Sequence, residues 1–319
     1  MEQQKVCRLE KDNRFEGYLL VRGAEKKTDR NGRDYVDLNL GDKTGEINAK
    51  IWNWEGTQPV PESGRPILVR GLVQEYNGRI QMRVEKWQTP RAGEVIPLEE
   101  LVPSAPRNPE DMLREIRETV AGFDNRSLRK LTEAMLAMAG ERLSWFPAAQ
   151  RMHHAERGGL LHHTTDMLRM AKAALEVYPW LNRDLLLSGV ILHDLGKLEE
   201  LESDENGNVT DYTRDGQLLG HLVRGITLLN RAAEQTGVTG EPLVLLEHML
   251  LSHHGEAEYG SPRPPMFPEA EALHWIDMMD ARMNTMKGAW EKTPEGAFSE
   301  KIFSLDRRVY HPNYTEEGK

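Results

Sequence analysis

The sequence LLLSGVILHDLGK occupies residues 185–197. Its first eight residues form a largely apolar run, which is typical of a buried helix, and His193 and Asp194 stand at the end of that run. An ionised aspartate in such surroundings needs a partner, and a metal cation is the strongest partner available. This stretch therefore predicts a helical domain that holds a metal site in its interior.

More histidines and a second aspartate stand on other segments with helical periodicity, so several helices are expected to contribute to this site. A lone buried histidine is usually a hydrogen-bonded core residue, but five histidines and two aspartates exceed what one zinc site needs. That number suits two divalent metal ions that share a bridging carboxylate. The candidate ligands are His163, His193, Asp194, His221, His253, His254 and Asp277. The expected helices cover residues 109–121, 125–139, 158–177, 183–195, 218–236, 242–253 and 268–288.

The order of these ligands resembles the HD superfamily of metal-dependent phosphohydrolases, in which a His, a His-Asp pair, further His and a distal Asp follow one another. The resemblance implies that a first metal ion is held by His163, His193, Asp194 and Asp277. It implies that Asp194 bridges to a second ion, which is held by His221, His253 and His254. Lys197 would contact the scissile phosphate, so Asp194 and Lys197 are the expected catalytic residues. Mn, Fe, Mg, Co and Ni all occur in such sites.

Residues 14–312 are similar to the YhaM type of 3′–5′ exoribonuclease, which places an OB-fold ahead of an HD domain. The segments that carry this similarity are GGLL at 158–161, HDLGK at 193–197, LLGH at 218–221, LSHHG at 251–255 and YGSP at 259–262. The chain departs from the family pattern at His162, where the family usually has an acidic or other polar residue. We take the neighbouring His163 as the ligand.

The N-terminal part of the chain reads as β-strands that are separated by polar turns. Five short strands with this spacing indicate a small barrel, and the OB-fold is the leading candidate, although SH3-like barrels share the pattern. The expected strands cover residues 15–21, 35–40, 46–52, 65–73 and 78–87.

An OB-fold binds single strands through aromatic side chains and a basic groove. We expect Tyr35 and Trp52 to stack on bases, and Lys50 and Arg33 to contact phosphates. The alternative for Trp52 is a place in the barrel core. Residues 42–52 are similar to the nucleic-acid-binding strand pair of the family.

Four prolines between residues 89 and 109 divide the chain. The expected organisation is an OB-fold domain over residues 1–90, a Pro-rich linker over 91–108 and an HD domain over 109–295. Residues 296–319 are expected to form a tail packed on the HD domain, and residues 201–214 a short hairpin between helices. The fold class is therefore an all-β barrel followed by an all-α bundle.

Composition excludes several other classes of protein. No window approaches 18 apolar residues, so no membrane span is expected, and the N-terminus lacks the apolar core of a signal peptide. The single cysteine, Cys7, excludes an internal disulfide and a zinc site built from several thiolates, which favours the cytoplasm. The net charge of −10 repels polyanions, so any nucleic acid must meet a local basic surface or a bound metal.

The function that these features favour is a metal-dependent 3′–5′ exoribonuclease, which hydrolyses single-stranded RNA or DNA to nucleoside 5′-monophosphates with two divalent ions. One alternative is an HD phosphohydrolase that acts on nucleotides or cyclic dinucleotides and uses its barrel for assembly. A second alternative is a single-strand-binding protein without activity. The resemblance also permits a homo-oligomer.

Three residues near the ligands are candidates for supporting roles. His153 and His154 precede the two glycines and could line a phosphate site, orient a ligand or lie on the surface. Asp280, one helical turn beyond Asp277, could orient a ligand or face solvent. Asp166 is expected to be an exposed helix residue.

Overall fold

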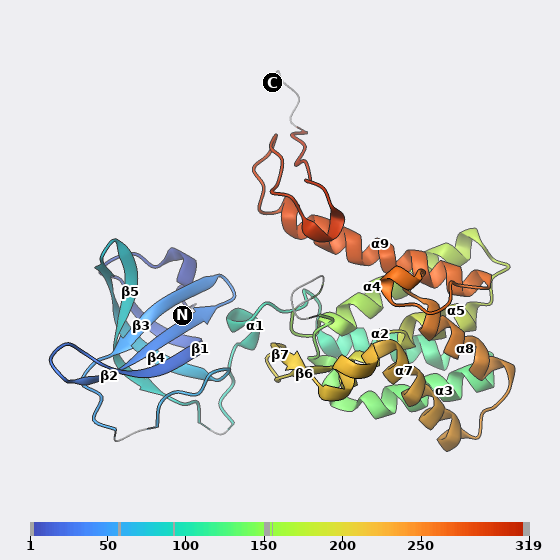
Figure 1. The fold of residues 1–319 in the computed structure, drawn as a ribbon, viewed down its shortest axis with the longest axis horizontal. Coiled ribbons are helices and arrows are strands. Elements are labelled where there is room, and N and C mark those ends of the chain that lie inside the picture. Colours follow the sequence, from blue (N-terminus) through green and yellow to red (C-terminus); the bar gives the residue numbers. More distant parts are fainter. Residues whose placement is uncertain (1–2, 57–58, 92, 150–153, 155, 315–319) are drawn as a thin grey trace. The chain divides into compact units, whose positions relative to one another are not determined.

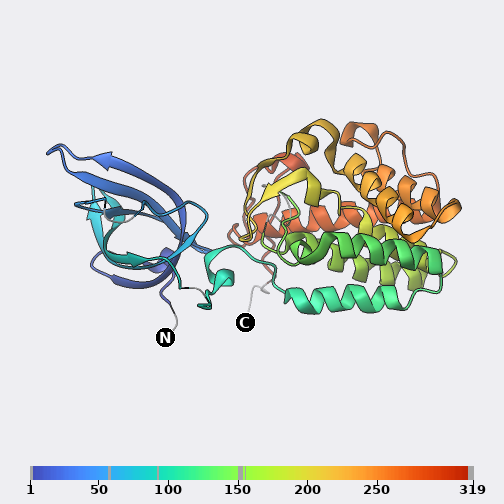
Figure 2. The same ribbon diagram turned by 90° about the horizontal axis from the view of Figure 1, so that it is seen from below.

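The computed structural model describes residues 3–56, 59–91, 93–149, 154 and 156–314. The chain forms two compact units, Met1–Ser104 and Ala105–Lys319, and each is described by itself. Figures 1 and 2 show the first unit as a set of strands and the second as a set of helices. The boundary between the units falls inside the segment expected to be the linker.

The first unit is a closed five-stranded barrel with the order β1-β2-β3-β5-β4. Its strands are β1 (Arg14–Thr28), β2 (Asp34–Asp42), β3 (Gly45–Ile51), β4 (Pro66–Tyr76) and β5 (Arg79–Gln88). Neighbouring strands are antiparallel except β3 and β5, which pair in parallel. The predicted barrel is confirmed, and β1 is longer than expected because its second half, from Leu20 to Thr28, pairs with β2.

Alternating side chains explain why these segments become barrel strands. In β2, Val36, Leu38 and Leu40 point into the core and are buried, while the residues between them are half-exposed. The turn between β4 and β5 is Asn77-Gly78, and both residues have positive φ angles, 50° and 72°. Such a pair matches the right-handed twist of the strands that it joins.

The second unit contains most of the helices. They are α2 (Pro109–Ala121), α3 (Arg126–Ala139), α4 (Gly159–Val177), α5 (Arg183–Leu192), α6 (Lys197–Glu200), α7 (Arg214–Thr236), α8 (Glu241–Ser252) and α9 (Pro268–Trp290). Between α6 and α7 lies the predicted hairpin, with strands β6 (Leu201–Ser203) and β7 (Val209–Tyr212). Short 3₁₀ turns are η1 (Val6–Arg8), η2 (Gly140–Ser144), η3 (Ala257–Tyr259) and η4 (Phe303–Leu305).

Helix α5 is the centre of this unit. Its residues from Asp184 to Leu192 are all buried, and it packs against α3, α4, α8 and α9. A helix that is apolar all round can be stable only when other helices surround it. The chain therefore delivers the His193–Asp194 pair, which directly follows α5, into the interior of the unit.

Two further segments lie outside the main elements, and the packing of the second of them on the helical unit stays a prediction. Helix α1 (Leu98–Leu101) contacts β1 and β2, and Leu101 is fully buried there. Near the C-terminus, isolated bridges join Phe298 to Tyr310 and Ile302 to Arg307. Within the described residues, no helix combines the length and the apolar character that a membrane crossing requires.

Candidate metal centre

The candidate ligands come together from five helices of the second unit. His163 lies in the first turns of α4, and His193 follows α5. His221 lies just after an interruption in α7, and His253 is the C-cap of α8. Asp277 comes from α9. Residues that are more than 100 positions apart in the chain are thus close in space.

One group of ligand atoms surrounds His163. Its Nε2 lies 3.3 Å from His193 Nε2 and 3.3 Å from Asp277 Oδ1. Asp194 Oδ2 is 3.7 Å from the same nitrogen and 3.3 Å from His193 Nε2. His163, His193 and Asp194 are buried.

A second group faces the other oxygen of Asp194. His221 Nε2 lies 3.6 Å from Asp194 Oδ1, and His253 Nε2 lies 3.8 Å from it. His221 Nε2 is also 3.3 Å from His254 Nε2. Asp194 therefore presents Oδ2 to one group and Oδ1 to the other, an arrangement that would allow this carboxylate to bridge two ions.

The spacing and the polarity of these groups fit divalent cations. Ligands at about 2.0–2.1 Å from a metal in a tetrahedral site lie about 3.3 Å from one another. Asp194 Oδ1 and His253 Nε2 are buried and have no hydrogen-bond partner among the described residues. Leaving such atoms unsatisfied costs free energy, and a cation between the ligands would satisfy both.

Hydrogen bonds from the far side of each ring turn the Nε2 atoms toward the centre. Nδ1 of His193 is 2.9 Å from the carbonyl oxygen of Val190, and Nδ1 of His253 is 2.8 Å from that of Leu250. A carbonyl oxygen only accepts, so each Nδ1 carries a proton. In the neutral form of such a ring the lone pair is then on Nε2, where a metal can bind it.

Two carboxylates hold the other histidines in the same way. Asp280 Oδ2 lies 2.6 Å from His163 Nδ1, so the expected orienting role of Asp280 has support from geometry. Glu200 lies 3.1 and 3.2 Å from His221 Nδ1, and it also accepts the backbone N–H of His221. Glu200 was not among the residues predicted from sequence. The acidic pair Glu199–Glu200, one residue after HDLGK, was the one available signal.

The charges of the centre shift the pKa values of its members. Burial alone would lower the pKa of His163, but hydrogen bonds with Asp277 and Asp280 outweigh it and raise that pKa to about 10. Burial opposes ionisation of Asp277, yet His163 and the other histidines hold its pKa well below the usual range. Burial lowers the pKa of His253. The centre thus favours positive charge at His163 and a neutral ring at His253.

Lys197 contacts the bridging aspartate. Its Nζ lies 2.7 Å from Asp194 Oδ2. Burial would lower the pKa of Lys197, but the charge of Asp194 raises it above its ordinary value, so the lysine is a fixed cation beside the ligands. Its contact with a substrate phosphate stays a prediction.

Two glycines allow the backbone to bring the ligands this close. A Cβ on Gly196 would lie 2.1 Å from the carbonyl oxygen of His221, so that the turn after Asp194 can touch α7 only with glycine there. Gly220 interrupts α7 with φ 70° and ψ 167°, a conformation that is open essentially to glycine alone. This interruption of the helix places the His221 ring beside Asp194.

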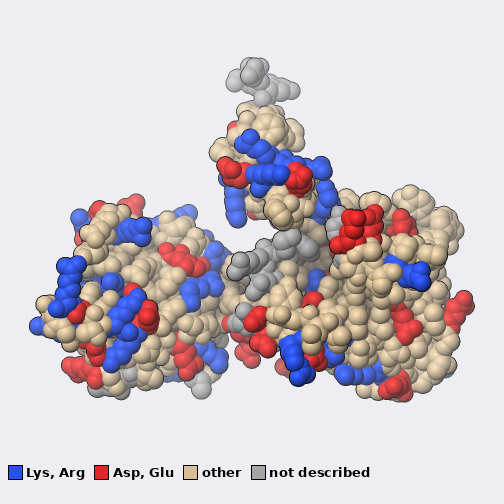
Figure 3. All heavy atoms as spheres, in the orientation of Figure 1, with Lys and Arg blue, Asp and Glu red and all other residues tan. Residues whose placement is uncertain are grey.

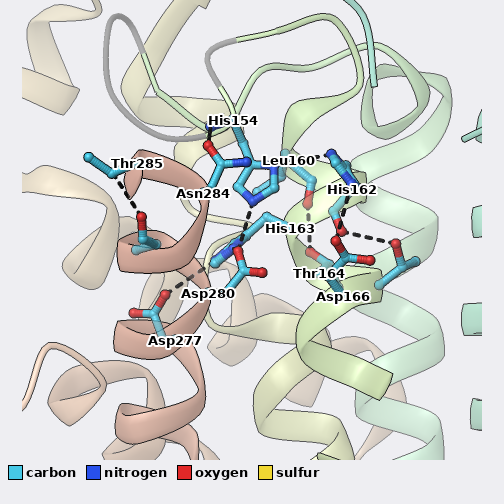
Figure 4. A network of polar contacts seen from close by, with 12 residues as sticks. His154, Leu160, His162, His163, Thr164, Asp166, Asp277, Asp280, Asn284 and Thr285 are labelled. Carbon is cyan, nitrogen blue, oxygen red and sulfur yellow. Dashed lines mark hydrogen bonds and ion pairs between the residues drawn. The ribbon is translucent and has the colours of Figure 1, made fainter. Parts of the chain in front are cut away.

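A second polar cluster adjoins Asp280, which His154 contacts at 2.8 Å (Figure 4). It consists of His154, Glu156, His162 and Asp166. His162 contacts Glu156 at 2.8 Å and Asp166 at 3.2 Å, whereas His163 turns toward Asp277 and Asp280. The expectation for Asp166 was wrong: it is half-buried and paired, because His162 lies one turn before it on α4. His153, the remaining candidate, lies outside the described residues.

On the barrel, three of the four predicted nucleic-acid-binding residues form one cluster. The rings of Tyr35 and Trp52 are 4.9 Å apart, and Lys50 Nζ lies 5.1 and 5.4 Å from their centres. Trp52 is 40% exposed, which excludes the core alternative. Arg33 is exposed in the turn between β1 and β2, and its contact with phosphate stays a prediction.

Charge is divided unequally between the two units. Residues 1–104 contain 17 Lys and Arg and 17 Asp and Glu, so the entire net charge of −10 belongs to residues 105–319. On the face drawn in Figure 3, basic and acidic side chains are interspersed over the barrel unit. The barrel therefore does not repel a polyanion as the chain-wide net charge suggested.

Family models match both units. A model described as an OB-fold nucleic acid binding domain matches residues 20–90, and an HD domain model matches residues 150–282. A helicase model, TraI_2, matches residues 102–178 and so overlaps the HD match. The HD match spans all seven candidate ligands, and this domain binds divalent metal.

Several relatives match along nearly their whole length, and each of the following is named 3′-5′ exoribonuclease YhaM. The protein of Geobacillus sp. is 38% identical over 96% of this chain and 94% of its own. The protein of Listeria monocytogenes EGD-e is 39% identical over 93% of this chain and 95% of its own. That of Halalkalibacterium halodurans is 38% identical over 95% of this chain and 94% of its own.

Proposed function

Since the chain belongs to the family of the YhaM 3′–5′ exoribonucleases, we propose that it shortens single-stranded RNA from the 3′ end by metal-dependent hydrolysis. The products would be nucleoside 5′-monophosphates. The observation that carries this proposal is the position of Asp194, whose two oxygens face two separate groups of histidines.

The residues that would hold two divalent ions follow from that geometry. The first ion would be held by His163, His193, Asp194 and Asp277, and the second by Asp194, His221, His253 and His254. When bound, such a pair lowers the pKa of water and offsets the charge of a phosphoryl group in an in-line displacement. Mn²⁺ is the ion that we propose to test first, with Fe, Mg, Co and Ni as the other candidates.

The protein's own groups would position the substrate and keep the ligands in place. Lys197, fixed as a cation 2.7 Å from Asp194, would offset negative charge on the scissile phosphate. Glu200 and Asp280 would hold the rings of His221 and His163 so that each Nε2 stays turned to the centre.

The barrel would supply affinity for the strand. Stacking of a base on an aromatic side chain tolerates any sequence, because every base has a π face. Tyr35 and Trp52, with Lys50 above both rings, form such a surface, and Arg33 would add a phosphate contact. Affinity for RNA would thus come from the first unit and hydrolysis from the second.

A labelled substrate tests the proposal. A 5′-labelled single-stranded RNA should shorten stepwise from its 3′ end when Mn²⁺ is added, and EDTA should stop the reaction. The same assay on single-stranded DNA shows whether the 2′-hydroxyl is needed. Intact RNA together with hydrolysis of nucleotides or cyclic dinucleotides would favour the phosphohydrolase alternative instead. Self-association and a cytoplasmic location stay predictions of the sequence.

A further inference from the structure

Three side chains outside the proposed dinuclear site converge on one point. His162 Nδ1 lies 2.8 Å from Glu156 Oε1 and 3.2 Å from His154 Nδ1, and His154 Nδ1 lies 3.8 Å from Glu156 Oε1. These three separations lie around the value of about 3.3 Å that tetrahedral coordination at 2.0–2.1 Å requires. All three atoms can act as metal ligands.

The outer nitrogens of both rings are already engaged with carboxylates. His154 Nε2 lies 2.8 Å from Asp280 Oδ2, and His162 Nε2 lies 3.2 Å from Asp166 Oδ2. An ionised carboxylate only accepts, so a ring nitrogen that faces one carries a proton in the metal-free protein. His162 faces Glu156 with Nδ1 and Asp166 with Nε2, so its ring carries a proton on each nitrogen. The Nδ1 proton lies between Glu156 Oε1 and His154 Nδ1, and a divalent cation in place of this proton would contact all three atoms.

The backbone holds this arrangement in place. His154 has a positive φ of 53°, and its N–H donates to Asn284 Oδ1 while its carbonyl accepts from the N–H of Ala148. A Cβ on Gly159 would lie 2.0 Å from that carbonyl oxygen, so the loop can lie against α4 only because glycine stands there. His154 and His162 are 4% and 8% exposed. The fold thus supplies two buried imidazoles in fixed positions.

We propose that His154, Glu156 and His162 form a third divalent-cation site, which takes Zn²⁺. Two imidazole nitrogens and one carboxylate oxygen are ligands that zinc accepts, and the partly exposed Glu156 leaves a side open for a water molecule. The site shares no ligand with the proposed dinuclear centre and goes beyond the proposed function.

Asp280 connects this site to the dinuclear centre. One of its oxygens, Oδ2, accepts from both His154 Nε2 and His163 Nδ1, at 2.8 and 2.6 Å. An ion on His154 Nδ1 keeps the proton on Nε2 and so preserves the contact with Asp280. Zinc at the third site is thus a positioning element for His163.

Metal retention after dialysis tests the proposal on the full chain. The wild type, Glu156→Ala and the control Glu234→Ala are loaded with Mn²⁺ and Zn²⁺, dialysed together and analysed by mass spectrometry of the metals. Glu234 is an exposed residue of α7. We expect Glu156→Ala to retain one zinc ion per chain fewer than the other two proteins. Equal zinc in all three would overturn the proposal.

Diffraction from the wild type gives an answer that does not depend on the folding of any variant. In crystals soaked with Zn²⁺, the anomalous signal at the zinc edge should show a peak at roughly 2 Å from each of the three ligand atoms. If the three side chains contact one another directly and no anomalous peak lies between them, the proposal is overturned. Neither readout depends on RNA hydrolysis, so an inactive protein that binds this zinc would refute the nuclease and leave the third site standing.

Discussion

At the scale of single residues, Asp194 lies between the two groups of candidate ligands. Its oxygens face His163 and His193 on one side and His221 and His253 on the other. Substitution of Asp194 by alanine should abolish turnover and lower the amount of bound metal. Loss of residues that only orient a ligand already costs 10- to 100-fold, so we expect at least roughly a hundredfold loss of activity.

A measurement of RNA affinity distinguishes this loss of catalysis from unfolding and from loss of substrate binding. RNA affinity, measured by fluorescence anisotropy, should stay at the wild-type value because the barrel is untouched. Asp124→Ala, at an exposed aspartate between α2 and α3, is the matched control and should keep full activity. Preserved activity in Asp194→Ala would assign the site elsewhere.

The pH dependence of metal binding depends on His163. Its pKa is raised to about 10 in the metal-free protein, so the ring is protonated at neutral pH, and an ion must displace that proton. Apparent affinity should therefore rise with pH, roughly tenfold per unit for one proton released. His253 has a lowered pKa, so it releases no proton when the metal binds. Calorimetry of Mn²⁺ binding between pH 6.5 and 8.5 checks the slope; a flat profile would contradict it.

The sequence allowed all seven candidate ligands to be selected, because histidine and aspartate rarely stand at the ends and inner faces of apolar helices unless they bind something there. Their partners were harder to find. Glu200 and Asp166 are ordinary acidic residues of amphipathic segments, and only the folded chain shows that each meets a histidine. The chain order carries no sign of the contact between His154 and Asp280, which are 126 positions apart.

At the scale of the elements, the interruption of α7 is the feature with the clearest energetic consequence. Gly220→Ala should destabilise the protein by about 1–3 kcal/mol, because an alanine resists φ 70° and ψ 167°. It should also weaken metal binding, since His221 would leave its place beside Asp194. Chemical denaturation and metal titration measure the two effects.

A second glycine provides the comparison. Gly288 lies in α9 with open space where a Cβ would be, so Gly288→Ala should stabilise the protein by roughly 0.5–1 kcal/mol. If both substitutions had the same effect on stability, the strained conformation of Gly220 would not be the cause.

Helix bounds followed from sequence where capping residues mark them. Helix α2 begins at Pro109 after the cap Asn108, as expected. Helix α7 begins four residues earlier than predicted, because Thr213 caps it by accepting from the N–H of Gly216. The interruption at Gly220 was not predicted, since a glycine inside a periodic segment does not by itself reveal its φ angle.

At the scale of the whole molecule, the two units have separate cores, so their contributions can be measured separately. A chain of residues 105–319 should still hydrolyse short model diesters but should bind long RNA at least roughly tenfold more weakly. The reason is that even one stacked base contributes about 1–3 kcal/mol. Equal loss of both activities would make the barrel part of the catalytic unit.

The unequal division of charge also bears on how products depart. Hydrolysis would release a nucleoside monophosphate with about two negative charges at neutral pH. It would form within the unit that carries the entire excess of ten acidic side chains, and the field of that unit repels a small dianion into solvent. The polymer would be held at the same time on a barrel without net charge, so successive cleavages would proceed without release of the strand.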